Sequence, residues 1–593
     1  MRSFSLRLVC AAFTALCCWG ASSVGLAAEA NRGNPNASPS RSPASILDLQ
    51  PYRRTDSLRI KDTAGVEGTA LLTNLNPAIN GWYLLELRWP NALVETYHLE
   101  NPSPKSQTVR LDANHPDGLV IGGGKAPYAC DLWGTTSQNG LRAARRLGAP
   151  YASLCGGRLY LRNHTPGRGT SLERVTDFLR ENVPAGDRIV GLVRDAYFPH
   201  LYEQRAETEP TRGAPGIAAQ HPSGHHPADA SLNPSDTSHT VKPLQLGIAS
   251  VAASEGGMAL GRWYAARDTP GVYVSVIQVN AIAPEVLRSY ATLVSPVEPV
   301  ESAALVYLAA FDLGQLGLKY ALGTDHPKVG WSDHMLPQMK NTALPGPDGI
   351  GSTAPVVSTG LINPPDANAT VATFTGGFKR IHGAFKYGEL ASRNGGSHYG
   401  FIEEGVVFSK LQPGLATLYV LEDGTVDMKT WADADDRLLP HIRYARQNGV
   451  PIISGLDVPT QVPVPGALVS RWGEGNWSGS ADRKLRTLRA GAGLQDTPGG
   501  RFLVYAFFWS ATPSAMARVF QAYGCRYAML LDMNALEHTY LAVYRRERGG
   551  VHAEHLIQEM QSIDASVDGR SCLRFLECAD NRDFFYLIRK EGR

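Results

Sequence analysis

The feature that most constrains the fold is a long stretch in mid-chain that has no periodicity. Residues 203–242 read EQRAETEPTRGAPGIAAQHPSGHHPADASLNPSDTSHTVK and are rich in Pro, Ser, Thr, Ala and His. Such composition predicts a disordered linker. The linker divides the chain into an N-terminal domain over residues 51–202 and a C-terminal domain over residues 243–593. A chain of 593 residues also exceeds what one hydrophobic core usually serves.

The start of the chain predicts export. Arg2 and Arg7 precede the apolar residues 8–26, which small and polar residues interrupt, and spaced small residues follow at 25–30. This pattern predicts a signal peptide over residues 1–28 that is cleaved, with an uncleaved anchor as the alternative. Residues 29–50 are polar and predict a disordered spacer. We therefore expect a secreted or periplasmic protein.

Charge and hydropathy exclude some partners. The chain has 57 Lys and Arg against 55 Asp and Glu, a formal net charge of +2. This charge is too small to indicate a nucleic-acid or anionic-membrane partner. No other segment is long and apolar enough to cross a bilayer, so we expect no integral membrane segment after signal cleavage. The oligomeric state stays open.

The cysteines predict disulfides. Of the 8 cysteines, Cys10, Cys17 and Cys18 leave with the signal peptide. The five that remain are Cys130, Cys155, Cys525, Cys572 and Cys578. In an oxidising compartment, proximity in sequence suggests that Cys130 pairs with Cys155 and Cys572 with Cys578. Cys525 is then left over, and a buried inert thiol is the favoured interpretation.

The N-terminal domain is predicted to be a small, β-rich α+β unit. Its short β-type runs are 82–88, 94–99, 108–111 and 119–121. Thr170 and Glu173 form a possible capping box before a helical pattern at 172–179, and a strand is predicted at 188–193. Nothing in this domain resembles a reaction centre.

The C-terminal domain is predicted to be α/β in a mixed α+β chain. Residues 272–279 (VYVSVIQV) fit a strand covered on both faces, and further strands are expected at 401–408, 416–421, 425–428 and 502–508. Asp423 and Gly424 predict a tight hairpin turn. Near the end of the chain, Thr512 caps a helix that has Pro513 in its first turn and Gly524 at its stop. A buried strand at 527–531 then delivers Asp532 at its C-terminal end.

Three segments combine glycine with residues able to bind a charged or hydroxylated ligand: 374–383 (FTGGFKRIHG), 489–493 (RAGAG) and 530–538 (LLDMNALEH). Each also has an ordinary structural explanation. The first is consistent with a surface loop, Arg489 with an ion pair, and Asp532 with a capped turn.

In order, GGF, a strand pair joined by Asp-Gly, R-x-G-x-G, and a helix-Gly-strand unit ending in Leu-Asp resemble the phosphodiester glycosidase family. That family includes the enzyme that uncovers mannose 6-phosphate tags and bacterial envelope proteins linked to exopolysaccharide. The resemblance spans roughly residues 271–544. Three positions, in two segments, depart from the family pattern. Thr375 replaces the Asn before Gly-Gly-Phe, and Met533 and Ala535 replace glycines of the LDGGGS signature, which implies a different pocket shape.

The resemblance implies roles for individual residues. Asp532 is expected to act as base or nucleophile, Arg489 as phosphate clamp, and His382 or His538 as proton-transfer partner. The residues expected to hold the substrate are Thr375, Gly376, Gly377, Lys379 and Asn534. Glu474 is a possible second carboxylate between Trp472 and Trp477, whose rings are sugar-stacking platforms or core residues.

The leading hypothesis is therefore an exported hydrolase that acts on phosphate-linked sugars or glycosidic bonds and needs no cofactor or metal. The first alternative is a non-catalytic glycan-binding or envelope-assembly protein. The second is a metal-dependent phosphodiesterase that uses Asp325, His326, Asp333 and His334 (GTDHPKVGWSDH), although structural hydrogen bonding also explains them. His221, His225, His226 and His239 are assigned to solvated linker. Asn163, Asn368 and Asn476 lie in N-x-[ST] sequons.

Overall fold

The structure is a computed structural model. It describes residues 44–61, 64–134, 140–169, 225–237, 240–250, 257–332, 335–383, 385, 388–392, 400–471, 486–564 and 571–590. The helix predicted at 172–179 and the strand predicted at 188–193 lie outside these ranges, as do residues 1–43.

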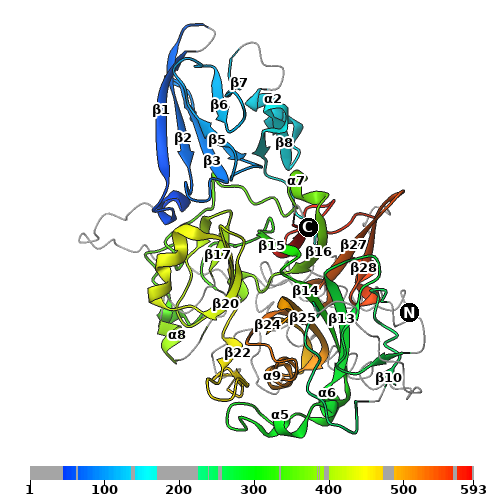
Figure 1. Cartoon of the computed structure of the whole chain (residues 1–593). Helices are drawn as coiled ribbons and strands as arrows, with labels where there is room; N and C mark the ends of the chain where they lie inside the picture. The colour runs from blue at the N-terminus through cyan, green and yellow to red at the C-terminus, as the bar shows by residue number, and fades with distance from the viewer. Residues whose placement is uncertain are drawn as a thin grey trace, which may run out of the picture. The chain divides into compact units, whose positions relative to one another are not determined.

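The N-terminal residues form a six-stranded antiparallel sheet, drawn in blue and cyan in Figure 1. Its strands in spatial order are β1 (Arg54–Lys61), β2 (Glu67–Asn74), β3 (Trp82–Arg88), β4 (Glu95–Glu100), β9 (Leu159–Arg162) and β8 (Tyr151–Leu154). The short helix α2 (Leu141–Leu147) precedes β8. The strand predicted at 82–88 is confirmed as β3, and the next predicted strand is β4.

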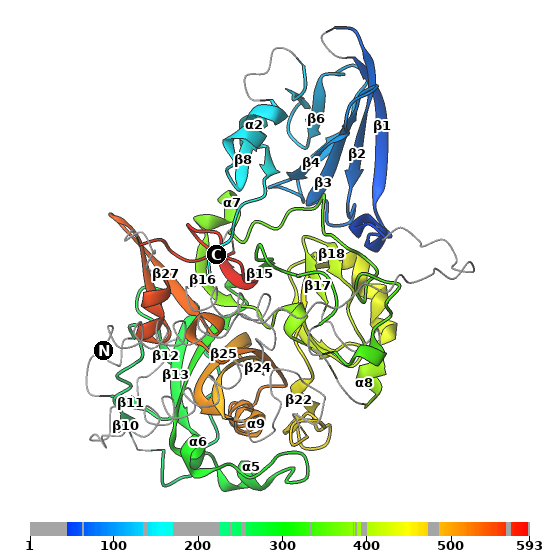
Figure 2. The ribbon, with the colours of Figure 1, turned by 180° about the vertical axis from the view of Figure 1, so that it is seen from behind.

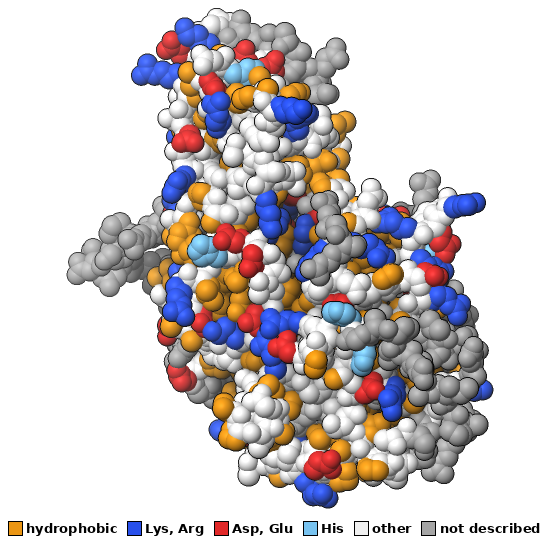
Figure 3. Space-filling model, in the orientation of Figure 1, with side chains coloured by type: hydrophobic (Ala, Val, Ile, Leu, Met, Phe, Trp, Pro, Cys, Tyr) orange, Lys and Arg blue, Asp and Glu red, His pale blue; other side chains and the backbone are white. Residues whose placement is uncertain are grey.

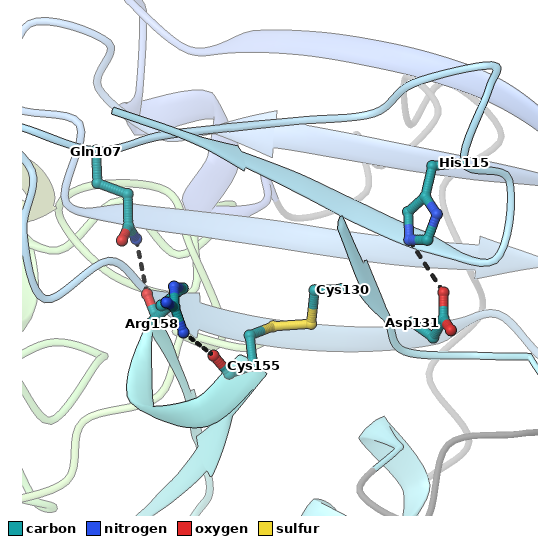
Figure 4. Close-up of a disulfide and its surroundings, with 6 residues drawn as sticks. All are labelled: Gln107, His115, Cys130, Asp131, Cys155 and Arg158. Carbon is teal, nitrogen blue, oxygen red and sulfur yellow. Dashed lines mark hydrogen bonds and ion pairs between the residues drawn. A yellow bond between two sulfur atoms is a disulfide. The ribbon is translucent and has the colours of Figure 1, made fainter. Parts of the chain in front are cut away.

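A three-stranded sheet lies beside it, made of β5 (Thr108–Arg110), β6 (Gly118–Gly122) and β7 (Tyr128–Asp131). The Cys130–Cys155 disulfide ties β7 to the turn after β8 (Figure 4). In the same view Arg158 donates to the Cys155 carbonyl, and Gln107 donates to the Arg158 carbonyl at 2.7 Å. The predicted disulfides Cys130–Cys155 and Cys572–Cys578 are both present, and Cys525 is buried with a free thiol.

The large sheet is the central element of the remaining chain. Its eight strands in spatial order are β12 (Tyr264–Ala265), β13 (Val272–Gln278), β14 (Leu305–Asp312), β25 (Gly500–Ala511), β24 (Thr487–Thr497), β26 (Tyr527–Met533), β22 (Pro451–Leu456) and β23 (Pro463–Pro465). Every described pair of neighbouring strands in it is antiparallel. This part of the chain is therefore mixed and strand-rich, which is consistent with the predicted mixed α+β class. Apolar runs such as VYVSVIQ suit a strand buried on both faces, whatever the direction of its neighbours.

Two five-stranded sheets complete the architecture. The β16 sheet consists of β15 (Leu316–Ala321), β29 (Phe584–Arg589), β16 (Thr370–Thr375), β27 (Leu541–Glu547) and β28 (Gly550–His555). The β21 sheet consists of β18 (Val406–Ser409), β17 (Phe401–Glu403), β21 (Ile442–Gln447), β19 (Ala416–Leu421) and β20 (Val426–Thr430). The Asp423-Gly424 turn between β19 and β20 is confirmed, since Gly424 has φ +91° and its N–H donates to the Leu421 carbonyl.

Helices are short apart from one. They are α5 (Pro284–Arg288), α6 (Pro299–Ala303), α7 (Pro364–Ala367), α8 (Gly388–Ser392) and α9 (Pro513–Ala522). Helix α9 begins as predicted, because the Thr512 hydroxyl accepts from the Ala515 N–H, and it ends before Gly524 at φ 65°. Helix α9 lies next to β24 and β25 (Figures 1 and 2). Its Met516 and Phe520 pack against Gly491 of β24.

The described residues bury two hydrophobic clusters. One cluster consists of residues from Ile60 to Leu161 in the two N-terminal sheets. The other runs through the three sheets of the remaining chain and also includes Trp82 and Leu84 of β3. Residues Pro43–Arg593 nevertheless form a single contact unit. Among the described residues no helix is long and apolar enough to cross a membrane.

Parts of the predicted spacer and linker are ordered. In the spacer, Ser45 caps a 3-10 helix over Ile46–Leu49 whose Ile46 is buried. In the linker, residues 225–237 contact the large sheet, because Ala228 exchanges hydrogen bonds with Gln495 of β24. Residues Thr240–Val241 form β10, which pairs with β11 (Met258–Ala259). These described parts of the predicted linker therefore belong to the folded structure.

A buried ionic cluster joins the N-terminal sheet to β17. Arg162 of β9 binds Glu100 of β4 and lies 3.5 Å from Glu403, while Glu403 accepts from the Leu322 N–H at 2.9 Å. The Arg162 guanidinium also stacks over the Trp82 ring. Burial raises the pKa of Glu403 to about 8 in spite of Arg162. The join between the two regions is thus sensitive to pH.

Replacing Glu403 should alter how stability depends on pH. The folded chain binds a proton at Glu403 between pH 4.5 and about 8 that the unfolded chain releases, so this contribution to stability is lost as pH rises. Relative to the parent, the free energy of unfolding of Glu403→Gln should therefore rise by up to about 1.4 kcal/mol per pH unit across that window, as measured by denaturant unfolding.

The neighbouring Glu404→Gln is the control. Arg443 and Tyr444 hold the pKa of Glu404 down, so this variant should lose stability by an amount that does not change between pH 5 and pH 8. Parallel curves for Glu403→Gln and the parent would contradict the prediction.

The two disulfides should contribute differently to the free energy of unfolding. Cys130–Cys155 closes 25 residues and Cys572–Cys578 closes 6. Loop-closure entropy then predicts that the pair Cys130→Ala and Cys155→Ala loses about 3.5 kcal/mol, and the other pair about 2 kcal/mol. Denaturant unfolding measured by circular dichroism tests the order. An equal loss, or a larger one for the short loop, would overturn it.

Candidate active site

Strand β26 presents Asp532 at its C-terminal end, as the sequence predicts. Leu530 pairs with Gly491 and Met533 with Arg489, so β26 carries one residue more than β24 over this stretch. Such a bulge re-aims side chains and is common beside active sites. Asp532 is 3% exposed, and its Oδ1 accepts from the Met533 N–H at 2.8 Å.

Arg582 joins Asp532 to His538. Its Nη1 lies 2.6 Å from Asp532 Oδ2, and its Nη2 lies 2.6 Å from His538 Nε2. His538 Nδ1 lies 2.8 Å from the Met533 carbonyl, which can only accept a hydrogen bond. This geometry assigns the proton to Nδ1 and leaves Nε2 as acceptor for Arg582, so His538 is neutral.

Burial sets the protonation of Asp532. Loss of solvation raises the pKa of the Asp532 carboxyl to about 6, although Arg582 and the Met533 N–H lower it. A carboxyl with this pKa exchanges protons near neutral pH. That is the property required of a general acid or base.

A second buried ion pair holds the surrounding loops. Arg446 of β21 binds Asp583 Oδ2 at 2.6 Å, and both side chains have no exposed surface. The Tyr320 hydroxyl donates to the same oxygen at 2.7 Å, and His326 Nδ1 lies 3.1 Å from Asp583 Oδ1. Burial lowers the pKa of His326 to about 4, so its ring is neutral at pH 7.

Gly376 and Gly377 fit closely against this framework. A Cβ on Gly376 would lie 2.4 Å from Asp583 Oδ2, and one on Gly377 would lie 2.8 Å from Asn448 Cγ. Asn448 accepts from the Phe378 N–H and donates to the Leu530 carbonyl, which joins this loop to β26. The missing side chains of these two glycines thus make room for Asp583 and Asn448. The sequence instead predicts that substrate approaches the backbone at these positions.

Arg489 does not join Asp532. Its side chain has no exposed surface, its Nε donates to the Ala511 carbonyl at 2.7 Å, and its Nη1 lies 3.2 Å from Met533 Sδ. Burial lowers the pKa of Arg489 to about 9. The arginine beside Asp532 is Arg582.

Lys379, Thr375 and Asn534 also have protein partners. Lys379 Nζ lies 2.9 Å from Oδ2 of Asp325, a carboxylate that is 39% exposed. The Thr375 hydroxyl donates to the His538 carbonyl at 2.7 Å and so positions that histidine. Asn534 has φ 79°, which asparagine tolerates better than most residues, and its Oδ1 accepts from Thr487.

Other predicted residues are only partly described. His382 ends a 3-10 helix over Arg380–His382, and its side chain lies outside the described residues. Glu474, Trp472, Trp477, Asp333, His334, His221 and His239 also lie outside them. In the part of the chain that the structure describes, no three His, Cys, Asp or Glu side chains are arranged to hold a metal ion.

Sequence reasoning missed Arg582, Asp583, Arg446 and Asn448. A signal for them exists, because the polar triplets Asn581-Arg582-Asp583 and Arg446-Gln447-Asn448 adjoin the buried strands β29 and β21. Polar side chains in such places are buried, so they need a partner.

Comparisons with known proteins add little. No model of a protein family matches the sequence, and no curated protein matches it. Among solved structures, the catalytic domain of zebrafish N-acetylglucosamine-1-phosphodiester alpha-N-acetylglucosaminidase, auto-inhibited by its pro-peptide, is similar with a TM-score of 0.28 and 10% identity. The match covers 65% of this chain and 96% of that chain. A TM-score this low establishes neither fold nor function.

Removing Arg582 should cost more stability at high pH than at low pH. Arg582→Ala leaves the buried Asp532 carboxylate unpaired, and we expect a loss of about 3 kcal/mol at pH 8. At pH 5, below the pKa of about 6, Asp532 is mostly neutral and the loss should be smaller. Denaturant unfolding at both pH values measures the difference. The control Arg501→Ala removes a partly exposed pair with Asp496 and should cost under about 1 kcal/mol at either pH. Equal losses for Arg582→Ala at both pH values would contradict the assigned pairing.

Proposed function

We propose that this protein is an exported hydrolase that cleaves sugar-1-phosphodiesters or related glycosidic bonds in extracellular or envelope glycans. The observation that carries the proposal is the buried Asp532, whose pKa of about 6 suits proton transfer and whose partner Arg582 also binds neutral His538. The proposal also rests on the sequence resemblance to phosphodiester glycosidases described above.

The proposed reaction requires few catalytic groups from the protein. In a sugar-1-phosphodiester, the bond from the anomeric carbon to the phosphate oxygen breaks, and its electron pair leaves with the phosphate. The leaving anion is stable, so little general-acid help is required. Water adds to the anomeric carbon, and Asp532 accepts the proton that this water releases. Attack by Asp532 itself, followed by hydrolysis of the glycosyl-enzyme, is the second route.

We assign the phosphate contact to Lys379. Its ammonium is held by Asp325, a carboxylate that reaches solvent, and an entering phosphate oxygen would take over the position of that carboxylate. Arg489, which donates to the Ala511 carbonyl and lies 3.2 Å from Met533 Sδ, is given no contact with substrate. His538, half-buried and fixed by Thr375, is the proposed proton-transfer partner, with His382 as the alternative.

The rival function is glycan binding without catalysis. It is favoured by the engagement of Gly376 and Gly377 with protein side chains, which leaves these glycines unavailable for substrate approach. Export, which both functions share, is supported by the signal-like start and by two disulfides.

A panel of sugar-1-phosphodiesters tests the proposal on the purified full chain. We expect the parent to release phosphomonoester, Asp532→Asn to lose at least about 100-fold in kcat/KM, and the exposed control Asp433→Asn to match the parent. The rate should fall as pH drops below about 6, because protonated Asp532 cannot accept the proton of water. If the parent protein hydrolyses none of these substrates, the proposal that it is a hydrolase is wrong. Glycan binding retained by all three proteins would then support the rival.

A further inference from the structure

A cleft lies at the far end of the β16 sheet from Asp532. It encloses about 660 Å³ and is lined by Arg267, Asp268, Asn368, Thr370, Val371, Tyr544, Arg545, Arg546, Glu547 and Arg589. A volume of this size is ordinary for a small-molecule or oligosaccharide site. None of the residues discussed around Asp532 lines it.

The cleft and the candidate active site lie at opposite ends of the strands β16, β29 and β27. β16 runs from Thr370 at the cleft to Thr375 beside His538, a span of about 17 Å at the usual rise per residue. β29 begins next to Asp583 and ends at Arg589, and β27 ends at Glu547. The cleft is therefore a second location, on the same strands.

Positive charge dominates the lining, with four arginines against two carboxylates. Arg545 is neutralised by Glu547 and Glu554, and Arg546 donates to the Ala367 carbonyl. Arg267 and Arg589 are exposed, and among the described residues their side chains have no hydrogen-bond or ion-pair partner. Figure 3 shows Lys and Arg side chains interspersed with Asp and Glu on the face over the β27–β28 hairpin. Two guanidinium groups are thus available to an anion.

The other lining residues narrow the class of anion. Asp268 and Glu547 lie 3.7 and 2.8 Å from Arg545 and are 67% and 54% exposed, so they can also accept hydrogen bonds from hydroxyl groups. They disfavour a doubly charged phosphate more strongly than a singly charged carboxylate. The exposed Asn368 amide both donates and accepts, and Tyr544 adds a ring to the wall. A ligand that carries carboxylates for arginine and hydroxyls for the acids and amide matches this set.

From this lining we infer that the cleft binds a uronic-acid-containing glycan, with Arg267 and Arg589 as its carboxylate contacts. Each planar guanidinium fork matches the two oxygens of one carboxylate. Hydroxyl groups of the sugar donate to Asp268 and Glu547. The site is independent of turnover at Asp532, so it stands whether or not the hydrolase proposal does.

Isothermal titration calorimetry of the purified full chain with a defined oligogalacturonate tests the assignment. We expect binding that weakens as salt rises, and a loss of about tenfold in affinity for Arg267→Ala and for Arg589→Ala, which is the scale of one charge-assisted hydrogen bond. Arg59→Ala, an exposed arginine on β1, is the matched control and should bind as the parent does. Circular dichroism checks that each variant is folded.

Two further ligands separate the possible outcomes. The methyl-esterified oligogalacturonate keeps the hydroxyls but lacks the charges, and it should bind at least about tenfold more weakly. Inorganic phosphate should bind weakly or not at all. The assignment is overturned if the ester binds as tightly as the acid, if the arginine variants match the parent, or if phosphate binds at these arginines while the uronate does not.

Discussion

The arrangement around Asp532 depends on one fully buried ion pair, Arg446–Asp583. Removing two charges from water is costly, and the cost is offset only when further hydrogen bonds satisfy both groups. Here Tyr320 donates to Asp583, and Arg446 donates to the Phe378 carbonyl. The pair thereby fixes β15, the Gly-Gly loop, β21 and the start of β29 against one another. Arg582 is the residue next to Asp583, so the same anchor sets the guanidinium that holds Asp532.

Local sequence signals predicted much of the secondary structure. Thr512, Pro513 and Gly524 marked the helix α9, and Asp423-Gly424 marked a hairpin, because each of these features depends on residues only a few positions apart. Strand direction was not predicted. A strand buried on both faces has the same apolar composition in a parallel and in an antiparallel sheet, so the run 272–279 carried no information on its neighbours.

The candidate site could be predicted only in part, because some of its residues are brought together by contacts between distant parts of the chain. Asp532 follows a buried strand directly, and its place at the strand end was visible in sequence. Its partner Arg582 lies 50 residues further on, and only tertiary pairing brings them together. Arg489 was assigned to the ligand because arginine suits phosphate. The partners that Arg489 has in the structure, the Ala511 carbonyl and Met533, depend on the register of β24 with β25 and β26, which sequence did not supply.

The place of β29 in its sheet has a consequence for how the chain is made. This strand, residues Phe584–Arg589, is the last described strand in sequence, yet it lies between β15 and β16 inside the sheet. Both neighbours are synthesised more than 200 residues earlier and have to wait, with unpaired edges, until the final strand arrives. Arg582 and Asp583 arrive with it. The β16 sheet and the anchor around Asp532 therefore stay incomplete during nearly all of the synthesis of the chain.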